Sequence, residues 1–233
     1  MSKTSIEPKV FDFVYNIAMS DAIHRTNCEH NIIEMFNSDE FEEAKRTAHS
    51  AVYNHASNII TGSNIEVVDT ANTVKASLNP DNLETGFKFG NAQKLINMTM
   101  KYLYIACSID PHHREKFTSC NSPMDSIMRD FVYRSWEILE PDNRRKWPGF
   151  CISHAWSNMD GDSGIAEYYA FQDTIRKIIR CKDIRIDGNP ISLLEFDYLF
   201  WDKAKALRDK NKDEQIRITE AIWYEFDNDP LHF

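Results

Sequence analysis

Residues 87–110 read FKFGNAQKLINMTMKYLYIACSID, and this stretch predicts the helix around which the chain is organised. At about 100° per residue, one broad arc of the helix is wide enough to face a hydrophobic core. Much of the remaining surface is also apolar, through Met98, Met100 and Ile105. We therefore expect a central helix with little contact with solvent. Its inner arc comprises Ala92, Leu95, Ile96, Thr99, Tyr102, Leu103 and Ala106.

The same helix carries a polar arc that has two interpretations. Gln93, Lys94, Asn97 and Lys101 fall together on the predicted helical wheel, with Tyr104 among them. The arc fits a wetted helix face, in which lysine stems cover apolar surface. It also fits the lining of a cleft, in which two lysines and two side-chain amides hold an anion. The pattern alone leaves both interpretations open.

The composition favours a single all-α domain. A chain of 233 residues is long enough for one large domain or two small ones, and it can fold without disulfides or metals. Its seven glycines are few, while helix caps and the apolar period of a helix recur along it. No internal repeat or linker interrupts the pattern. We expect one bundle-like α-helical domain over residues 1–233, with roughly seven to nine helices.

The charge and the cysteines restrict the class of protein. A formal net charge of −9 argues against broad, non-specific binding of nucleic acid, but it is compatible with a local basic cleft. The five cysteines are scattered and form no CxxC pair, which suits reduced thiols. No apolar run approaches about 18 residues, and the first residues lack a signal-peptide pattern. These features predict a cytoplasmic protein without a membrane segment.

Local signals predict where two further elements begin or turn. Ser122 and Pro123 have the residue types preferred at the N-cap and the first position of a helix. We expect that helix to begin there. A small β-hairpin is expected near residues 184–191, with Asp187 and Gly188 as its turn.

Residues 25–30 read RTNCEH, which places Arg25 and His30 in an R-x4-H spacing. This resembles the short signature of HEPN-type ribonucleases, although Thr26 stands where Asn, Asp or His would fit that family better. In that family the arginine and histidine of two protomers face each other and cleave RNA without a metal. The resemblance implies a homodimer in which Arg25 steadies the scissile phosphate. His30 would act in proton transfer.

A second resemblance involves the central helix itself. The segment FGNAQKLINMTMKYLYI, followed by SCNSPMDSIM, is similar to a pattern in uncharacterised bacterial proteins of about this size. There a Cys-His-Cys triplet precedes Pro-Met-Asp, whereas Cys120, Asn121 and Ser122 occupy those places here. The resemblance implies no activity, but it does suggest one cluster of polar side chains. The candidate substrate-binding residues of this cluster are Gln93, Asn97, Lys101 and Asp125.

We expect no metal site and no cofactor. Asn158, Asp160 and Asp162 have the alternating spacing of a calcium loop. However, Ser163 replaces the turn glycine of such a loop, and Tyr169 stands where its bidentate glutamate should be. A polar turn before a helix explains the pattern better. The chain also has no glycine-rich phosphate loop.

Two functional hypotheses follow from the sequence. The first is a helical protein that handles RNA or nucleotides, with the HEPN-like, metal-independent endoribonuclease as its specific form. The second is a non-enzymatic binding or regulatory protein that acts through a protein interface. The second predicts that Arg25, His30 and Lys101 do not converge on one cleft.

Overall fold

The computed structural model describes residues 6–24, 41–63, 65–108, 110, 112–139 and 148–229, and these residues form an all-α fold with one small hairpin. The all-α prediction is confirmed, and nine α-helices occur in the described ranges. None of these helices is long and apolar enough to cross a membrane. The elements are α1 (Pro8–Ile23), α3 (Glu42–Ile60), α4 (Val67–Leu78), α5 (Phe89–Ala106), α6 (His113–Lys116), α7 (Ser126–Leu139), η3 (Trp156–Asn158), α8 (Gly161–Cys181), β1 (Arg185–Ile186), β2 (Asn189–Pro190), α9 (Leu193–Ala204), η4 (Lys205–Leu207) and α10 (Lys212–Asn228).

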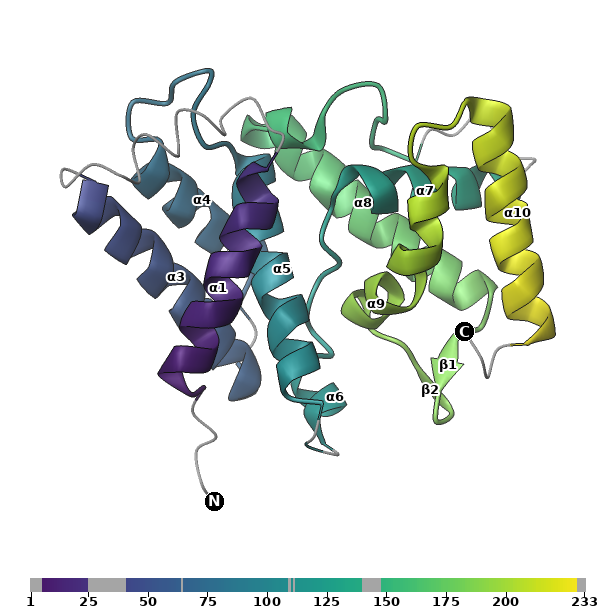
Figure 1. The fold of residues 1–233 in the computed structure, drawn as a ribbon, viewed down its shortest axis with the longest axis horizontal. Helices are drawn as coiled ribbons and strands as arrows, with labels where there is room; N and C mark the ends of the chain where they lie inside the picture. The colour runs from purple at the N-terminus through teal and green to yellow at the C-terminus, as the bar shows by residue number, and fades with distance from the viewer. Residues whose placement is uncertain are drawn as a thin grey trace.

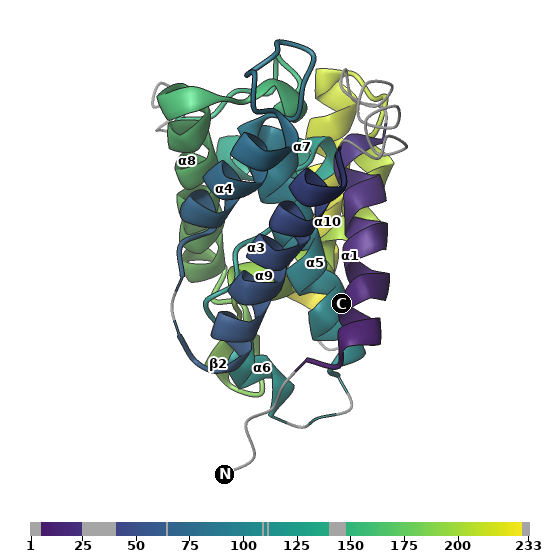
Figure 2. The same ribbon diagram turned by 90° about the vertical axis from the view of Figure 1, so that its left-hand side faces the viewer.

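Helix α5 lies at the centre of the fold, as its sequence predicts. It contacts α1, α3 and α4 on one side and α8, α9 and η3 on the other (Figures 1 and 2). Fourteen of its eighteen residues are buried, including polar ones. A helix so enclosed can present side chains to two packed layers at once.

The second half of the chain packs α7, α8, α9 and α10 around an aromatic cluster (Figure 1). The ring centroid of Phe131 lies 5.4 Å from that of Phe200 and 5.6 Å from that of Trp223. Such pairs stabilise a fold by about 0.5–1.5 kcal/mol each beyond the burial of their area. Buried side chains from both halves belong to one hydrophobic cluster.

The predicted hairpin is present between α8 and α9. Arg185 pairs with Pro190, and Ile186 pairs with Asn189, in an antiparallel register. The two turn residues, Asp187 and Gly188, have positive φ angles of 51° and 77°. Asp and Gly tolerate this conformation, which explains why the sequence signal was reliable.

The predicted start of α7 is wrong by three residues. The helix begins at Ser126 rather than at Pro123, and Asp125 rather than Ser122 caps it. The Met128 amide donates to Asp125 Oδ1 at 2.9 Å. Residues 122–124 do not join the helix because their backbone is engaged by two buried glutamines.

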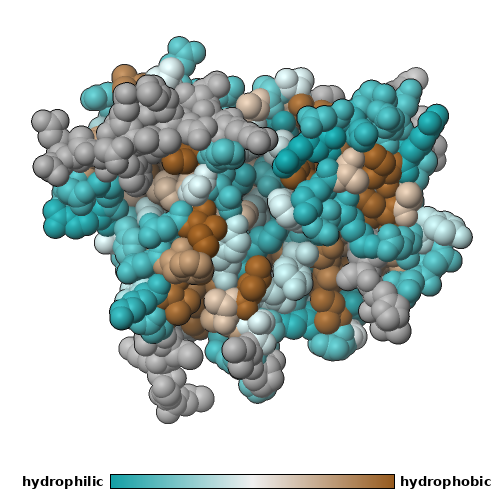
Figure 3. Space-filling model, in the orientation of Figure 1, coloured by the Kyte–Doolittle hydropathy of each residue, from teal (hydrophilic) through white to brown (hydrophobic). Residues whose placement is uncertain are grey.

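The surface is mainly hydrophilic, with apolar residues exposed along α1 and the end of α5 (Figure 3). Phe13 is 66% exposed, and Val10, Ile17 and Ile105 are also exposed. Next to them is a groove of about 370 Å³ lined almost entirely by apolar side chains of α1 and α5.

Candidate ligand-binding cleft

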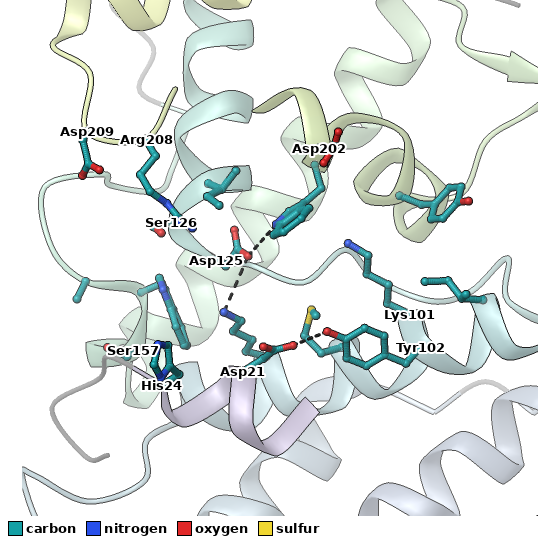
Figure 4. A pocket seen from close by; sticks show the side chains of 18 residues that line it. Asp21, His24, Lys101, Tyr102, Asp125, Ser126, Ser157, Asp202, Arg208 and Asp209 are labelled. Carbon is teal, nitrogen blue, oxygen red and sulfur yellow. Dashed lines mark hydrogen bonds and ion pairs between the residues drawn. The ribbon is translucent and has the colours of Figure 1, made fainter. Parts of the chain in front are cut away.

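A cleft of about 800 Å³ opens between the two halves of the fold. Its walls come from α1, α5, the start of α7, η3, α9 and the connection between η4 and α10 (Figure 4). This volume is in the range of small-molecule sites. Its aromatic lining consists of Tyr102, Trp156, Tyr198 and Trp201.

Lys94 lies at one end of the cleft floor. Its side chain is only 12% exposed. Its ammonium group is 4.5 Å from the ring centroid of Trp156 and 3.9 Å from Asp125 Oδ2. The ring face and the carboxylate both attract the ammonium group at this position.

Lys101 lies on the same face of α5, seven residues further along. Seven residues correspond to two helical turns and about 10 Å along the axis. Its ammonium is 2.5 Å from Asp197 Oδ2 and 5.0 Å from the ring centroid of Trp201. Asp197 is buried beneath the cleft, and this burial raises the pKa of its carboxyl to about 6, despite the opposing effect of Lys101.

The Asp125 carboxylate connects the two ends of the floor. Oδ1 accepts the Met128 amide and so caps α7. Oδ2 accepts the Trp201 indole N–H at 3.3 Å and lies 3.9 Å from Lys94 (Figure 4). One side chain therefore sets the position of a helix, an indole and an ammonium group.

Two buried glutamines hold the segment that leads to Asp125. Gln93 of α5 donates to the Met124 carbonyl at 2.9 Å and accepts the Met124 amide at 3.3 Å. Gln172 of α8 donates to the Ser122 carbonyl at 2.8 Å and accepts the Ser122 amide at 3.1 Å. A primary amide places an N–H donor beside a carbonyl acceptor, as a neighbouring β-strand does, and so can pair with both backbone groups of one residue. Pro123, between the two pairs, has no N–H that requires a partner.

The rim of the cleft carries charges of both signs. Asp21 accepts a hydrogen bond from the Tyr102 hydroxyl, which joins α1 to α5 (Figure 4). Asp202, Asp209 and Arg208 lie at the opposite rim. The floor, by contrast, places its two lysines against indole rings and carboxylates.

The structure brings two of the four candidate substrate-binding residues to the cleft surface. Lys101 and Asp125 line it, while Gln93 and Asn97 are fully buried beneath it. The Asn97 amide donates to the Tyr168 hydroxyl at 2.9 Å and to Gln93 Oε1 at 3.2 Å. These two amides therefore support the cleft from below.

The candidate catalytic residues Arg25 and His30 lie outside the described residues, so their roles stay predictions. His24 is the last described residue before them, and it lines the cleft (Figure 4).

The sequence identified Lys94, with Lys101 two turns away, as part of a polar arc that fits the lining of an anion-binding cleft, and both lysines line this cleft. Trp156, Trp201 and Asp197 were not identified as candidates from the sequence, since their positions depend on how distant helices pack.

Of the three residues with the spacing of a calcium loop, Asp160 forms a structural contact instead. Asp160 precedes α8, and its carboxylate lies 2.7 Å from the Lys75 ammonium of α4. In the described part of the chain, no group of three or more His, Cys, Asp and Glu side chains is placed to hold a metal ion.

Comparison of the chain with protein-family models, curated proteins and solved structures gave no match. The chemistry of the cleft is therefore the basis for assigning a function.

The glutamine pairs generate a prediction for stability. Replacing Gln172 by leucine leaves the buried Ser122 amide and carbonyl without partners, so we expect the free energy of unfolding to fall by at least about 2 kcal/mol. Urea denaturation measures this. Asp173→Asn, at the exposed next position of α8, should change stability by less than about 0.5 kcal/mol. Equal stability of Gln172→Leu and the wild type would contradict the role of the pair.

Proposed function

We propose that the cleft binds a nucleotide, either free or at the end of a short RNA. The observation that supports this is the pairing of cation and ring: Lys94 lies against Trp156, and Lys101 lies against Trp201. Lysine ammonium groups bind phosphate, and indole rings provide surfaces for bases. A nucleotide carries both kinds of group within the dimensions of such a cleft.

The rim restricts the size of the ligand. Asp21, Asp202 and Asp209 surround the opening, and the chain as a whole carries a net charge of −9. A long polyanion would be repelled along such a rim, because most of its phosphates would lie outside the two floor lysines. These charges favour a mononucleotide or an RNA end over a duplex.

The specific form of this proposal is metal-independent RNA cleavage by Arg25 and His30. It is supported by the R-x4-H resemblance and by the position of His24, since the sequence passes from this cleft residue directly into Arg25. In this form the cleft would hold the base and phosphate next to the reacting bond.

Binding is tested by titrating the protein with the four ribonucleoside monophosphates and with the dinucleoside monophosphate ApA, using tryptophan fluorescence and calorimetry. We expect Lys94→Ala and Lys101→Ala each to weaken binding at least tenfold, or about 1.4 kcal/mol, because each removes a charge-assisted contact.

The matched control for these variants is Lys177→Ala. Lys177 also lies over an indole, 5.2 Å from the ring centroid of Trp136, but it is exposed and does not line the cleft. Its replacement should leave affinity unchanged. If none of the five probes bound at concentrations up to about 1 mM, the nucleotide proposal would be rejected.

Cleavage is tested separately with a fluorescent single-stranded RNA. We expect the wild type to cleave it in the presence of EDTA. His30→Ala should abolish cleavage without lowering the melting temperature, because proton transfer is lost while the cleft remains. An unchanged rate in His30→Ala would remove the ribonuclease form but leave nucleotide binding intact.

A second candidate function is association with another copy of this chain through α1. The exposed Phe13 lines the apolar groove together with Val10, Ile17 and Ile105. In an isologous contact, each Phe13 would enter the groove of the other protomer. The homodimer implied by the R-x4-H resemblance also supports this reading.

Native mass spectrometry tests this association. We expect a dimer for the wild type and a monomer for Phe13→Glu, because a charge would be buried in the contact. The control is Tyr224→Glu, which places the same charge at a position that is 72% exposed on α10. A monomeric wild type at micromolar concentration would contradict the interface.

A further inference from the structure

The ion pair between Lys101 and Asp197 joins the cleft to the core. The Lys101 side chain is 10% exposed and reaches the cleft, whereas the Asp197 side chain is 1% exposed. Asp197 Oδ1 has no hydrogen-bond partner among the residues that the structure describes. The carboxylate is thus enclosed, and its charge depends on the neighbouring lysine.

The charged groups around Asp197 come from α5 and from the segment before α7. Lys101 and Lys94 of α5 favour the ionised carboxylate, and Lys101 makes the direct contact. Asp125 opposes ionisation, and the Tyr102 hydroxyl also lies within electrostatic range. Burial disfavours the charged form most strongly, so the pKa of Asp197 is raised to about 6.

This arrangement restricts how Lys101 can bind a ligand. If its ammonium turned towards a phosphate in the cleft, Asp197 would remain as a buried charge without its main counter-charge. Such a charge is strongly unfavourable, as it is when one partner of a buried ion pair is removed. Protonation of the carboxylate relieves that cost.

We propose that Lys101 is a phosphate-binding group of the cleft, and that it exchanges Asp197 for the ligand as Asp197 takes up one proton. The proton comes from solvent and adds to a carboxylate oxygen. Lys101 remains an ammonium ion throughout, and no covalent bond to the ligand forms. This inference rests on the proposed nucleotide binding and adds its regulation by pH.

The sign of the pH dependence follows from the state of Asp197 in the free protein. Below about pH 6 the carboxyl is already protonated, so binding takes up no proton. Above that pH the free protein is ionised at Asp197 and the complex is not. Affinity should therefore fall as pH rises, by up to about tenfold per pH unit.

The probe for the test is ApA, because its single phosphodiester keeps the same charge from pH 5 to pH 8. A phosphomonoester would lose a proton itself near pH 6, with a second pKa of about 6, and so obscure the result. Calorimetry in buffers of different ionisation enthalpy counts the protons taken up. We expect uptake near zero at pH 5 and approaching one per ligand at pH 7.5.

Two variants identify the group that takes the proton. Asp197→Asn should bind ApA without proton uptake, and more tightly than the wild type at pH 7.5, because Lys101 no longer has a charged competitor. His24 is the histidine among the residues that line the cleft, and the exchange assigns it no part in proton uptake. His24→Gln should therefore retain the uptake.

The outcomes separate this inference from the function on which it rests. Binding of ApA by the wild type with no proton uptake at pH 7.5 would overturn the exchange and leave nucleotide binding in place. Loss of uptake in His24→Gln would overturn it as well. Failure of ApA to bind at any pH would overturn both proposals. The wild-type measurement decides the question even if Asp197→Asn does not fold.

Discussion

The cleft depends on the requirement that buried backbone groups be hydrogen-bonded. Residues 122–124 cross the interior outside any helix or strand, where an unpaired amide or carbonyl costs about 1–3 kcal/mol. Gln93 of α5 hydrogen-bonds both the amide and the carbonyl of Met124. Gln172 of α8 does the same for Ser122. This segment ends where Asp125 caps α7, and that carboxylate in turn positions Trp201 and Lys94.

The two lysines of the cleft floor are each stabilised by neighbouring groups. Their side chains are about nine-tenths buried, but each ammonium group lies against an indole ring and beside an aspartate carboxylate, so neither charge is buried without a partner. The two aspartates differ in one important respect. Asp125 has further partners in the α7 amide and the Trp201 indole, whereas Asp197 relies mainly on Lys101. Only the second pair is therefore sensitive to the loss of its lysine.

Sequence patterns predict the parts of this fold that local chemistry controls. The period of residues 87–110 identified the central helix, and Asp187-Gly188 identified the hairpin turn, because both signals act within a few residues. The start of α7 was misplaced because Ser122 and Pro123 fit a helix start locally, while Gln172, fifty residues away, holds Ser122 out of it. Asp197 and both tryptophans reach the cleft only through tertiary packing, which no spacing in the chain reveals.

The polar arc of α5 shows why its two interpretations could not be separated by pattern. Gln93 and Asn97 turn towards the core, where their amides bind backbone and side-chain partners, while Lys94 and Lys101 reach the cleft. A helical wheel places all four together, since it records the direction of a side chain around the helix axis but not which neighbouring elements cover that side chain. The arc as a whole is therefore neither a solvent-exposed face nor a cleft lining. Its amides hold the adjacent segment in place, and its lysines carry the charge that a ligand would meet.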